Sequence, residues 1–493
     1  MAKYKYVGWD KVTAYTTETG SKKAKYLLWG DRVEVLDESG SRTKIRSRSR
    51  YSEMYVDKDA LDGEALLELY FIDVGQGDGV LIVTPDRKHI LIDGGYPRRK
   101  QNTGKSAADF VDWKFFNDYK KNKIHLDAMI CSHNDEDHYG GLADLLDVDQ
   151  VDELNCKGIS VDKFYHAGLS WWKTPTKSRT LGEVTQGHFT NLLTSRTSAI
   201  NGLKRSANPK LQGEWSKFLK KVTKTKTRSN KNTPFKRLSH KQTIDDGVFG
   251  KHVSVKVLGP IETSTSNGKG LKKLGGNSQN TNGHSVLMRL DYGGARVLLT
   301  GDLNKKSMRY LLDEYDGEET EFLADVSKAC HHGSDDVSFE FLAAIKPAVT
   351  VISSGDAEGH DHPRPSIIGA SGSTGYLTVK DDEIVTPLVY STELARSVSL
   401  GDPYSLKLPN SNSEITGSTF DKAKINYSET KPGALNPEKK SRTLGYSYIV
   451  AGQVYGLVNV RTDGKKILCA TMNEGNGSWQ TKVINARFQS GSA

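Results

Sequence analysis

The pattern of apolar and polar positions repeats itself once along the chain. Residues 78–95 (DGVLIVTPDRKHILIDGG) and 284–302 (HSVLMRLDYGGARVLLTGD) each read as strand, turn and strand, and each ends on an acidic, glycine-rich turn. Further along, each unit leads into another strand (DAMICSHNDEDH and DVSKACHHGSDD) and then a helical stretch (GGLADLL and SFEFLAAI). A hairpin, helix, strand and helix that occur twice predict an α/β sandwich of two similar halves, with polar strand ends converging on one edge.

Shorter segments flank and interrupt these halves. Before residue 65, runs such as VTAYTT and RVEVLDES alternate apolar and polar residues between Gly/Ser turns, which predicts a small all-β domain. Residues 156–249 form an insertion between the halves, and the polar segment 402–446 predicts a surface loop. We therefore divide the chain into an N-terminal β domain (1–64), a main domain (65–475) and a C-terminal tail (476–493).

Composition places the chain among ordinary globular proteins. It has 493 residues, of which 36% are hydrophobic and 26% charged. No segment approaches the roughly 20 consecutive apolar residues of a membrane span, and the N-terminal MAKYKYVGWDKV lacks the apolar core of a secretory signal. We therefore expect a cytoplasmic protein without a membrane partner. The four cysteines form no CxxC pair, so we expect buried, reduced thiols.

The positive charge is concentrated in the insertion. Residues 172–241 hold 17 Lys and Arg against 2 acidic residues, a local charge of +15, so the rest of the chain carries −6 of the total +9. One interpretation is a nucleic-acid surface, with Lys220, Lys221 and Lys224 on phosphates and four nearby aromatics stacked on unpaired bases: Trp171, Trp172, Trp215 and Phe218. The alternative is a mobile, solvated loop. The pattern EWSKFLKKV predicts a short amphipathic helix, which favours partial order.

The segment 132–141, SHNDEDHYGG, holds a compact set of metal-binding side chains: His133, Asp135, Asp137 and His138. Residues two apart in an extended segment point the same way, so His133 and Asp135 can bind one ion. An immediate turn would direct Asp137 and His138 toward a second ion. Imidazole and carboxylate groups bind Zn²⁺, Mn²⁺ or Fe without redox-prone thiols. The pattern predicts a metal site; the alternative is a solvated acidic turn with two incidental histidines.

Together with FIDVGQGDG (71–79), LIDGG (91–95), LLTGD (298–302) and HHGS (331–334), this motif resembles the metallo-β-lactamase superfamily. The resemblance is to the branch that contains the nuclease-like domain of ComEC DNA-uptake proteins and pneumococcal phosphorylcholine esterase. It runs from about residue 66 to residue 472, insertions excepted, and implies an αββα sandwich. The N-terminal segment resembles a bacterial SH3-like domain, which would offer a surface to a protein partner. The alternative there is a plain β-extension of the main domain.

The resemblance implies two divalent metal ions as cofactors, Zn²⁺ or its competitor Mn²⁺. The implied ligands of the first ion are His133, Asp135 and His284. Those of the second ion are Asp137, His138 and His332, with His331 as the alternative to His332. Asp302 would bind both ions. An exposed turn histidine is the alternative for His284. The family's more familiar pattern is H-x-H-x-D-H, and Asp135 replaces its second histidine. A carboxylate is a harder ligand than an imidazole, so this replacement makes one metal site harder and keeps Mn²⁺ as an alternative to Zn²⁺.

Other polar residues follow the same motifs. The resemblance implies that Asp93 orients a metal ligand, and Asp78 is a candidate for a similar role, whereas Asp73 is equally consistent with capping its own turn. The resemblance to the ComEC branch also covers GHDHPRP (359–365), and it implies that His362 holds a phosphate oxygen or protonates the leaving oxygen. Arg364 would clamp phosphate. A proline-flanked surface turn is the alternative for this segment.

These features together predict an enzyme, a dinuclear metal-dependent hydrolase that cleaves phosphodiester bonds. Asp137 and His362 are the expected catalytic residues, and nucleic acid is the expected substrate because of the local +15 charge and the ComEC-like motifs. A phosphoesterase of a nucleotide or another small ester is the alternative, which the SH3-like segment favours. A non-catalytic adaptor would have no need for so complete a set of ligands.

Overall fold

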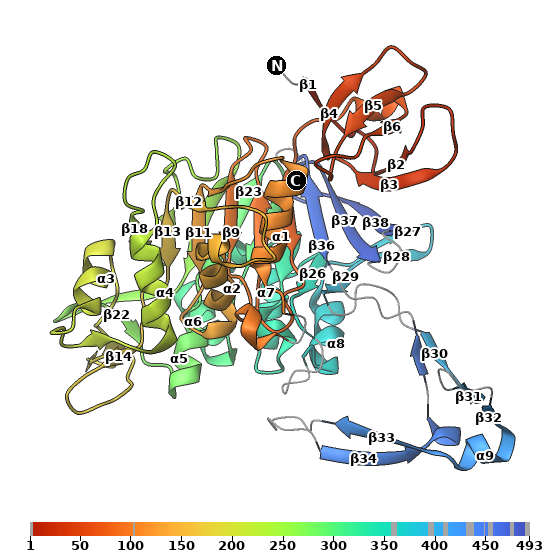
Figure 1. Ribbon diagram of the computed structural model, residues 1–493. Coiled ribbons are helices and arrows are strands. Elements are labelled where there is room, and N and C mark those ends of the chain that lie inside the picture. Colours follow the sequence, from red (N-terminus) through yellow and green to blue (C-terminus); the bar gives the residue numbers. More distant parts are fainter. Residues whose placement is uncertain are drawn as a thin grey trace.

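The computed structural model describes residues 3–101, 104–355, 362–392, 399–407, 413–429, 438–447, 449–451, 457–473 and 478–488. Two large β-sheets form the body of the main domain (Figure 1). The first has the order β18-β13-β11-β9-β8-β7-β36-β37-β38. Its strands are β7 (Leu67–Phe71), β8 (Val80–Val83), β9 (His89–Ile92), β11 (Ala128–Cys131), β13 (Phe164–His166), β18 (Phe235–Arg237), β36 (Val458–Thr462), β37 (Lys466–Asn473) and β38 (Ser478–Asn485).

The second sheet has the order β19-β20-β23-β24-β25-β26-β29. Its strands are β19 (Gln242–Thr243), β20 (Ser254–Gly259), β23 (Leu287–Tyr292), β24 (Ala295–Leu299), β25 (Val326–Lys328), β26 (Val349–Ile352) and β29 (Leu388–Ser391). Small sheets at the periphery use β10 (Ile124–Leu126), β12 (Ile159–Val161), β14 (Trp172–Lys173), β15 (Val184–Thr185), β16 (His188–Phe189), β17 (Lys210–Leu211), β21 (Glu262–Thr265), β22 (Gly268–Lys272), β27 (Thr378–Lys380) and β28 (Glu383–Thr386).

The two sheets bury a shared apolar core, and helices cover their outer faces. Ile82 and Ile130 of the first sheet belong to the same buried cluster as Val257 and Val297 of the second. The outer face of the first sheet packs against α1 (Ala107–Trp113), α2 (Glu136–Leu146) and α4 (Gly213–Lys224). The second sheet is covered by α6 (Lys305–Glu314) and α7 (Phe339–Ile345). This arrangement confirms the αββα sandwich.

The predicted internal repeat is present in the topology. In the first half, β8 and β9 form an antiparallel hairpin, α1 follows, and β11 then lies parallel to β9 before α2. In the second half, β23 and β24 form the hairpin, α6 follows, and β25 lies parallel to β24 before α7. The carboxyl ends of β9 and β11 therefore face those of β24 and β25 at one edge of the sandwich.

Residues 3–61 form an all-β unit of their own (Figure 1). Six antiparallel strands have the order β1-β4-β5-β6-β2-β3 and enclose a separate core that includes Val12, Leu27 and Ile45. They are β1 (Lys3–Tyr6), β2 (Lys11–Tyr15), β3 (Lys23–Leu28), β4 (Arg32–Asp37), β5 (Thr43–Arg46) and β6 (Met54–Val56). Arg461 of β36 joins this unit to the main domain, because its buried guanidinium donates to Asp31 Oδ1 at 2.8 Å.

The insertion is shorter and more ordered than the sequence predicts. Strands β13 and β18 belong to the first large sheet, so the added segment lies between them, at residues 167–234. It contains α3 (Arg196–Leu203) and the predicted amphipathic helix, α4. Four aromatic side chains proposed to stack on bases are buried instead: Trp171, Trp172, Trp215 and Phe218. They form the apolar contact of the insertion with the main domain, so stacking on bases is wrong for them.

The C-terminal region differs from the predicted surface loop and the predicted tail. The described parts of 402–446 hold β31 (Ser405–Lys407), β32 (Glu414–Thr416), α9 (Gly417–Lys422), β33 (Lys424–Glu429) and β34 (Glu438–Thr443), which project from the body together with β30 (Ser399–Gly401) and β35 (Ile449–Ala451) (Figure 1). The segment expected to be a tail contributes the edge strand β38, whose Trp479 and Ile484 are buried.

All four cysteines are buried and unpaired, as expected: Cys131, Cys156, Cys330 and Cys469. Within the ranges that the structure describes, none of the helices has the length and apolar character needed to cross a membrane.

Candidate metal centre

The H-x-D-x-D-H motif sits where β11 ends and α2 begins. Asp135 is the N-cap of α2, and Asp137 and His138 lie in its first turn. The helix can approach the turn after β9 because glycines face each other there: a Cβ on Gly141 would lie 1.9 Å from the carbonyl oxygen of Gly94. This close approach sets the first turn of α2 against the acidic turn of the LIDGG segment.

Asp93 fixes the orientation of His138. Both side chains are buried, and His138 Nδ1 donates to Asp93 Oδ2 at 2.9 Å. The other oxygen of Asp93 accepts the backbone N–H of Ser132 at 2.8 Å, so this carboxylate cannot turn away. A histidine whose Nδ1–H is held by a carboxylate presents the lone pair of Nε2, which is the form that binds a metal.

Asp78 lies beside His332, a histidine of the second half of the repeat. His332 Nδ1 lies 3.1 Å from Asp78 Oδ1 and 3.2 Å from the carbonyl oxygen of Ser353. His332 itself adopts a left-handed backbone conformation, with φ of 53°. Its side chain is fully buried. Each half of the repeat therefore contributes one buried histidine with a buried aspartate beside its Nδ1, although the hydrogen bond of His332 Nδ1 is to the carbonyl oxygen of Ser353.

The two histidines converge on one carboxylate. Asp302 Oδ2 lies 3.1 Å from Nε2 of His138 and 2.9 Å from Nε2 of His332. Asp137 Oδ2 lies 3.6 Å from Nε2 of His332, and ligand atoms of all four residues lie within 4.8 Å of one another. Among the described residues, neither Nε2 atom has a hydrogen bond of acceptable alignment. Buried lone pairs that face carboxylates in this way fit a divalent cation.

His133 and Asp135 form a second group beside this cluster. The rings of His133 and His138 have centroids 4.0 Å apart, and His133 Nε2 lies 3.8 Å from Asp135 Oδ2. Hydroxyl groups of Ser132 and Ser285 lie 3.0 and 3.2 Å from His133 Nδ1, which leaves Nε2 facing the site. This second group has fewer protein ligands than the first.

The surroundings raise the pKa of two groups at the site, His332 and Asp135. Burial opposes protonation of His332, but the carboxylates of Asp302 and Asp78 raise its pKa to about 9. Burial and the neighbouring carboxylate of Asp137 raise the pKa of Asp135 to about 6. The converging carboxylates therefore attract protons or metal ions, and the two compete.

A buried lysine that the sequence motifs do not include belongs to the same network. Lys328 donates to the carbonyl oxygen of Gly301 at 2.9 Å, contacts the carboxylate of Asp78, and lies 3.7 Å from Asp302 Oδ1. These acidic neighbours raise the pKa of Lys328 although burial opposes the charge. The signal in the sequence is a lysine within the apolar strand β25, every residue of which is buried.

The structure does not bring His284 to the cluster. Its ring is buried with Nε2 2.8 Å from the carbonyl oxygen of Lys272, and burial lowers its pKa to about 4. His284 lies at the C-cap of α5 (Asn277–Gly283), and that short helix directs other residues toward the site. The hydroxyl of Thr281 donates to Asp135 Oδ2 at 2.8 Å, and Asn282 Nδ2 lies 3.2 Å from Nε2 of His331.

His331 and His362 lie at the rim of the cluster. His331 Nε2 is 3.9 Å from Asp302 Oδ2, whereas His332 is 2.9 Å from the same atom, so the geometry favours His332 as the ligand. The rings of His331 and His362 have centroids 5.8 Å apart. Arg364 caps α8 (Pro365–Thr374), and its backbone N–H donates to the carbonyl oxygen of Gly333 at 2.9 Å. Residues 359–361 of the GHDHPRP segment lie outside the described residues.

The acidic turn residue Asp73 takes the simpler of its two expected roles. Its carboxylate is exposed and accepts the backbone N–H of Gly75 at 3.2 Å. This contact caps the turn. Asp78 and Asp93 lie beside histidines of the cluster.

The three lysines expected to bind phosphate, Lys220, Lys221 and Lys224, lie on α4, which packs against α2. Tyr139, the residue after His138, has its ring centroid 5.3 Å from that of Phe218. Lys220 and Lys224 are exposed, whereas Lys221 contacts the carboxylate of Asp147. The basic face of α4 is therefore attached to the helix that carries the metal motif.

Comparison with known proteins gives a consistent result. Residues 72–354 match the family described as the metallo-beta-lactamase superfamily. The chain is 34% identical over 102 residues to Competence protein ComA of Neisseria gonorrhoeae, covering 20% of this chain and 14% of that protein. It is 30% identical over 310 residues to ComE operon protein 3 of Bacillus subtilis (strain 168), covering 61% of this chain and 30% of that protein. The chain thus spans less than a third of either relative.

Solved structures show low overall similarity. Igni18, a metallo hydrolase from Ignicoccus hospitalis, is 12% identical, with a TM-score of 0.30, over 65% of this chain and 98% of its own. Zn²⁺-bound PqqB from Methylobacterium extorquens is 8% identical, with a TM-score of 0.32, over 62% of this chain and 96% of its own.

Proposed function

The chain belongs to the metallo-beta-lactamase superfamily, and from that premise we propose that it is a dinuclear metal-dependent hydrolase that cleaves phosphodiester bonds of nucleic acid. Members of the superfamily are metal-dependent hydrolases. The observation that carries the proposal is the convergence of His138 and His332 on Asp302, with Asp137 beside them.

The two groups of side chains would hold the two ions. Asp137, His138, His332 and Asp302 would bind one ion, and His133 and Asp135 would bind the other, with Asp302 shared. Mixed imidazole and carboxylate ligands suit Zn²⁺ and also Mn²⁺. A bound pair of divalent ions lowers the pKa of a shared water and stabilises the charge that develops on a phosphoryl oxygen.

The protein's own groups would prepare this chemistry. Asp93 accepts from Nδ1 of His138, and the carbonyl oxygen of Ser353 accepts from Nδ1 of His332, with the carboxylate of Asp78 beside it. These contacts would fix both rings before substrate arrives. His362 lies at the rim beside His331, where a histidine could bind a phosphate oxygen or protonate the leaving oxygen. Arg364 would add a cation for phosphate near the same rim.

The exposed basic face of α4 supports nucleic acid as the substrate. Lys217, Lys220 and Lys224 are exposed on the helix that packs against α2. Such side chains release counterions from a phosphate backbone. Because the nearby aromatics are buried, the interface would consist of phosphate contacts and read little sequence. Similarity to a protein named for competence also supports this substrate class.

A cleavage panel tests the proposal. Single- and double-stranded DNA, RNA and bis-p-nitrophenyl phosphate are each incubated with the wild type and with His133→Ala, in Zn²⁺ or Mn²⁺. Polynucleotide cleavage that His133→Ala abolishes would establish a metallonuclease. Turnover of the small diester alone would retain the metal chemistry and assign the site to nucleotides or small esters. No turnover of any substrate would contradict the proposal.

A further inference from the structure

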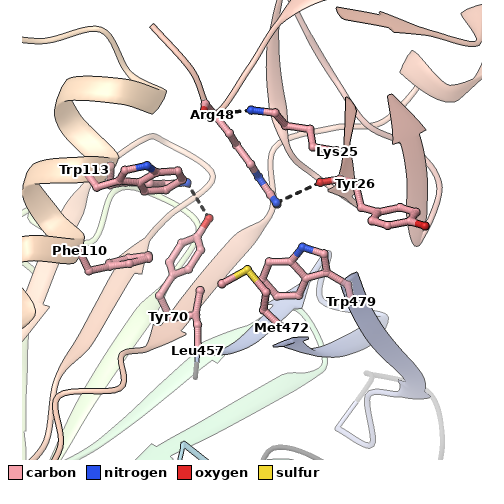
Figure 2. A pocket seen from close by; sticks show the side chains of 10 residues that line it. Lys25, Tyr26, Arg48, Tyr70, Phe110, Trp113, Leu457, Met472 and Trp479 are labelled. Carbon is pink, nitrogen blue, oxygen red and sulfur yellow. Dashed lines mark hydrogen bonds between the residues drawn. The ribbon is translucent and has the colours of Figure 1, made fainter. Parts of the chain in front are cut away.

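A cavity of about 310 Å³ lies between the N-terminal β unit and the main domain, and none of its lining residues belongs to the metal centre. Figure 2 shows Lys25, Tyr26 and Arg48 of the N-terminal unit on one side, with side chains of the main domain opposite. A volume of this size falls in the range of sites for small organic ligands, and such sites often form between domains.

The walls are aromatic and apolar. Five aromatic residues line the cavity, together with Leu457 and Met472: Tyr26, Tyr70, Phe110, Trp113 and Trp479. On one side the centroids of Tyr70 and Phe110 are 5.4 Å apart, and those of Phe110 and Trp113 are 6.0 Å apart. Trp113 remains 37% exposed, although burial of the large apolar surface of an indole normally stabilises a protein. A flat, unsaturated ligand would cover the ring of Trp113 and pack against these walls.

Two of the three cations at the cavity already have ionic partners. Lys114 Nζ lies 2.7 Å from Asp118 Oδ2 and donates to the hydroxyl of Tyr70 at 2.9 Å. The guanidinium of Arg48 lies 2.5 Å from Asp31 Oδ2. These charges are compensated within the protein and require nothing from a ligand.

Lys25 differs from these two cations. Its ammonium group donates to the carbonyl oxygen of Arg48 at 3.3 Å, and it forms no ion pair with any residue in the described ranges (Figure 2). Burial and the nearby guanidinium of Arg48 lower the pKa of Lys25. The carboxylates of Asp118 and Asp31 favour the charge of Lys25 from a distance without pairing with it. A half-buried cation without a direct ionic partner is unfavourable, and an anion beside it would relieve that cost.

We propose that this cavity binds a small aromatic anion, whose ring packs between the aromatic walls and whose acidic group pairs with Lys25. This chemistry is shared by nucleoside monophosphates and by aromatic carboxylates. Because the lining residues come from both units, such a ligand would also hold the N-terminal unit against the main domain. Binding would therefore raise the melting temperature of the whole chain.

The experiment uses the full chain and two matched probes, 2-naphthoate and the neutral 2-naphthalenemethanol, with affinity measured by calorimetry. We expect 2-naphthoate to bind more tightly than the alcohol. Lys25→Met should weaken 2-naphthoate binding about tenfold and leave the alcohol unchanged, because only the anion loses a charge-assisted hydrogen bond. Trp113→Ala should weaken both probes. Lys25→Arg should restore the preference for the anion, and Lys22→Met, an exposed neighbour, serves as the control.

Two further comparisons make the result decisive. A carboxylate can also bind a metal, so the titration is repeated after metal has been removed with a chelator. Unchanged affinity for 2-naphthoate supports binding in the cavity. Lost affinity assigns the binding to the metal centre and overturns the proposal. Absence of 2-naphthoate binding, or equal binding by the wild type and Lys25→Met, would also overturn it. Within a positive result, tighter binding of AMP than of indole-3-acetate identifies a nucleotide source, and the reverse order identifies an aromatic carboxylate.

Discussion

His138 and His332 face each other across the edge of the sandwich, with ring centroids 5.2 Å apart, and both direct Nε2 to the same oxygen of Asp302. One histidine comes from each half of the internal repeat. Nδ1 of His138 donates to Asp93, whereas Nδ1 of His332 donates to the carbonyl oxygen of Ser353 and lies 3.1 Å from Asp78 Oδ1. The duplicated hairpin, helix, strand and helix thus produces a single centre that neither half could form alone.

Asp302 is the residue on which this centre depends most. Asp302→Asn keeps the shape of the side chain and removes the charge that both histidines face. We expect loss of bound metal and a fall in diester hydrolysis of more than about 100-fold, beyond the 10- to 100-fold typical of outer contacts. Metal analysis and initial rates on bis-p-nitrophenyl phosphate measure the two effects. Retention of full metal content by a folded Asp302→Asn protein would contradict the assignment.

The orienting carboxylates give a graded effect. Asp93→Asn should weaken metal binding by about 10- to 100-fold, because His138 keeps its place and loses its fixed tautomer. Asp78→Asn should weaken it less, because the carbonyl oxygen of Ser353 still accepts from Nδ1 of His332. Asp73→Asn is the matched control, since that carboxylate caps an exposed turn. Competition with a chromogenic chelator measures affinity in all three proteins. Equal affinity in Asp73→Asn and Asp93→Asn would mean that the contact with His138 has no role in binding.

His284 provides a test of the ligand set itself. The family motif implies that it binds the first ion, whereas the structure directs its Nε2 to the carbonyl oxygen of Lys272. We expect His284→Gln to keep full metal content and to lower the melting temperature, because glutamine can still donate to that carbonyl but fills the buried site less well than the ring. Loss of one equivalent of metal in His284→Gln would restore the motif-based ligand set.

The sequence predicts the scaffold of this site well. Apolar alternation marks both hairpins, and the ligands of the H-x-D-x-D-H motif are neighbours in the chain, so a single strand end places them. The burial of Trp215 and Phe218 could also be predicted, because they share one face of a helix with Val222.

Contacts between distant segments could not be predicted in the same way. Polar α5 has no apolar periodicity, so nothing in its sequence indicates whether His284 or Thr281 faces the site. Lys328 resembles an exposed strand residue until Asp78, 250 positions earlier in the chain, is brought against it. Such pairings depend on how the two sheets face each other, which local patterns do not encode.

Acid should weaken the contact between the N-terminal unit and the main domain. Burial alone would raise the pKa of Asp31, but the cations of Arg461 and Arg48 hold it well below its ordinary value. The ion pair therefore stabilises the folded protein above the unfolded carboxyl pKa of about 4, and this stability is lost as the pH falls below it. The free energy of unfolding in urea should fall more steeply from pH 5 to pH 3 in the wild type than in Asp31→Asn.

The same variant should also be less stable at neutral pH, by about 3 kcal/mol, because the buried guanidinium of Arg461 would lose its nearest carboxylate and keep only the more distant one of Glu68. Identical pH dependence in the wild type and Asp31→Asn would show that this ion pair does not control the acid transition. Asp37→Asn, an exposed carboxylate of the same unit, is the control.

The exposed face of α4 predicts a dependence on salt. Reversing Lys217, Lys220 and Lys224 to Glu should weaken polynucleotide binding and reduce the slope of log K against log salt by about 2–3, near 0.7–0.9 for each phosphate that a lysine no longer neutralises. Reversal of Lys380, Lys466 and Lys482, which are exposed on other elements, changes the net charge equally. Equal effects of the two triple variants would mean that net charge, and not this face, governs binding.

The most direct test of the metal mechanism is to titrate chelator-treated protein with Zn²⁺ or Mn²⁺ while following bound metal and hydrolysis of bis-p-nitrophenyl phosphate together. We expect the metal-free protein to be inactive. The group with four protein ligands should fill first, and activity should return as the second equivalent binds, in the wild type and not in Asp302→Asn. Full hydrolysis by the metal-free protein, or metal-restored activity that does not need Asp302, would contradict this mechanism.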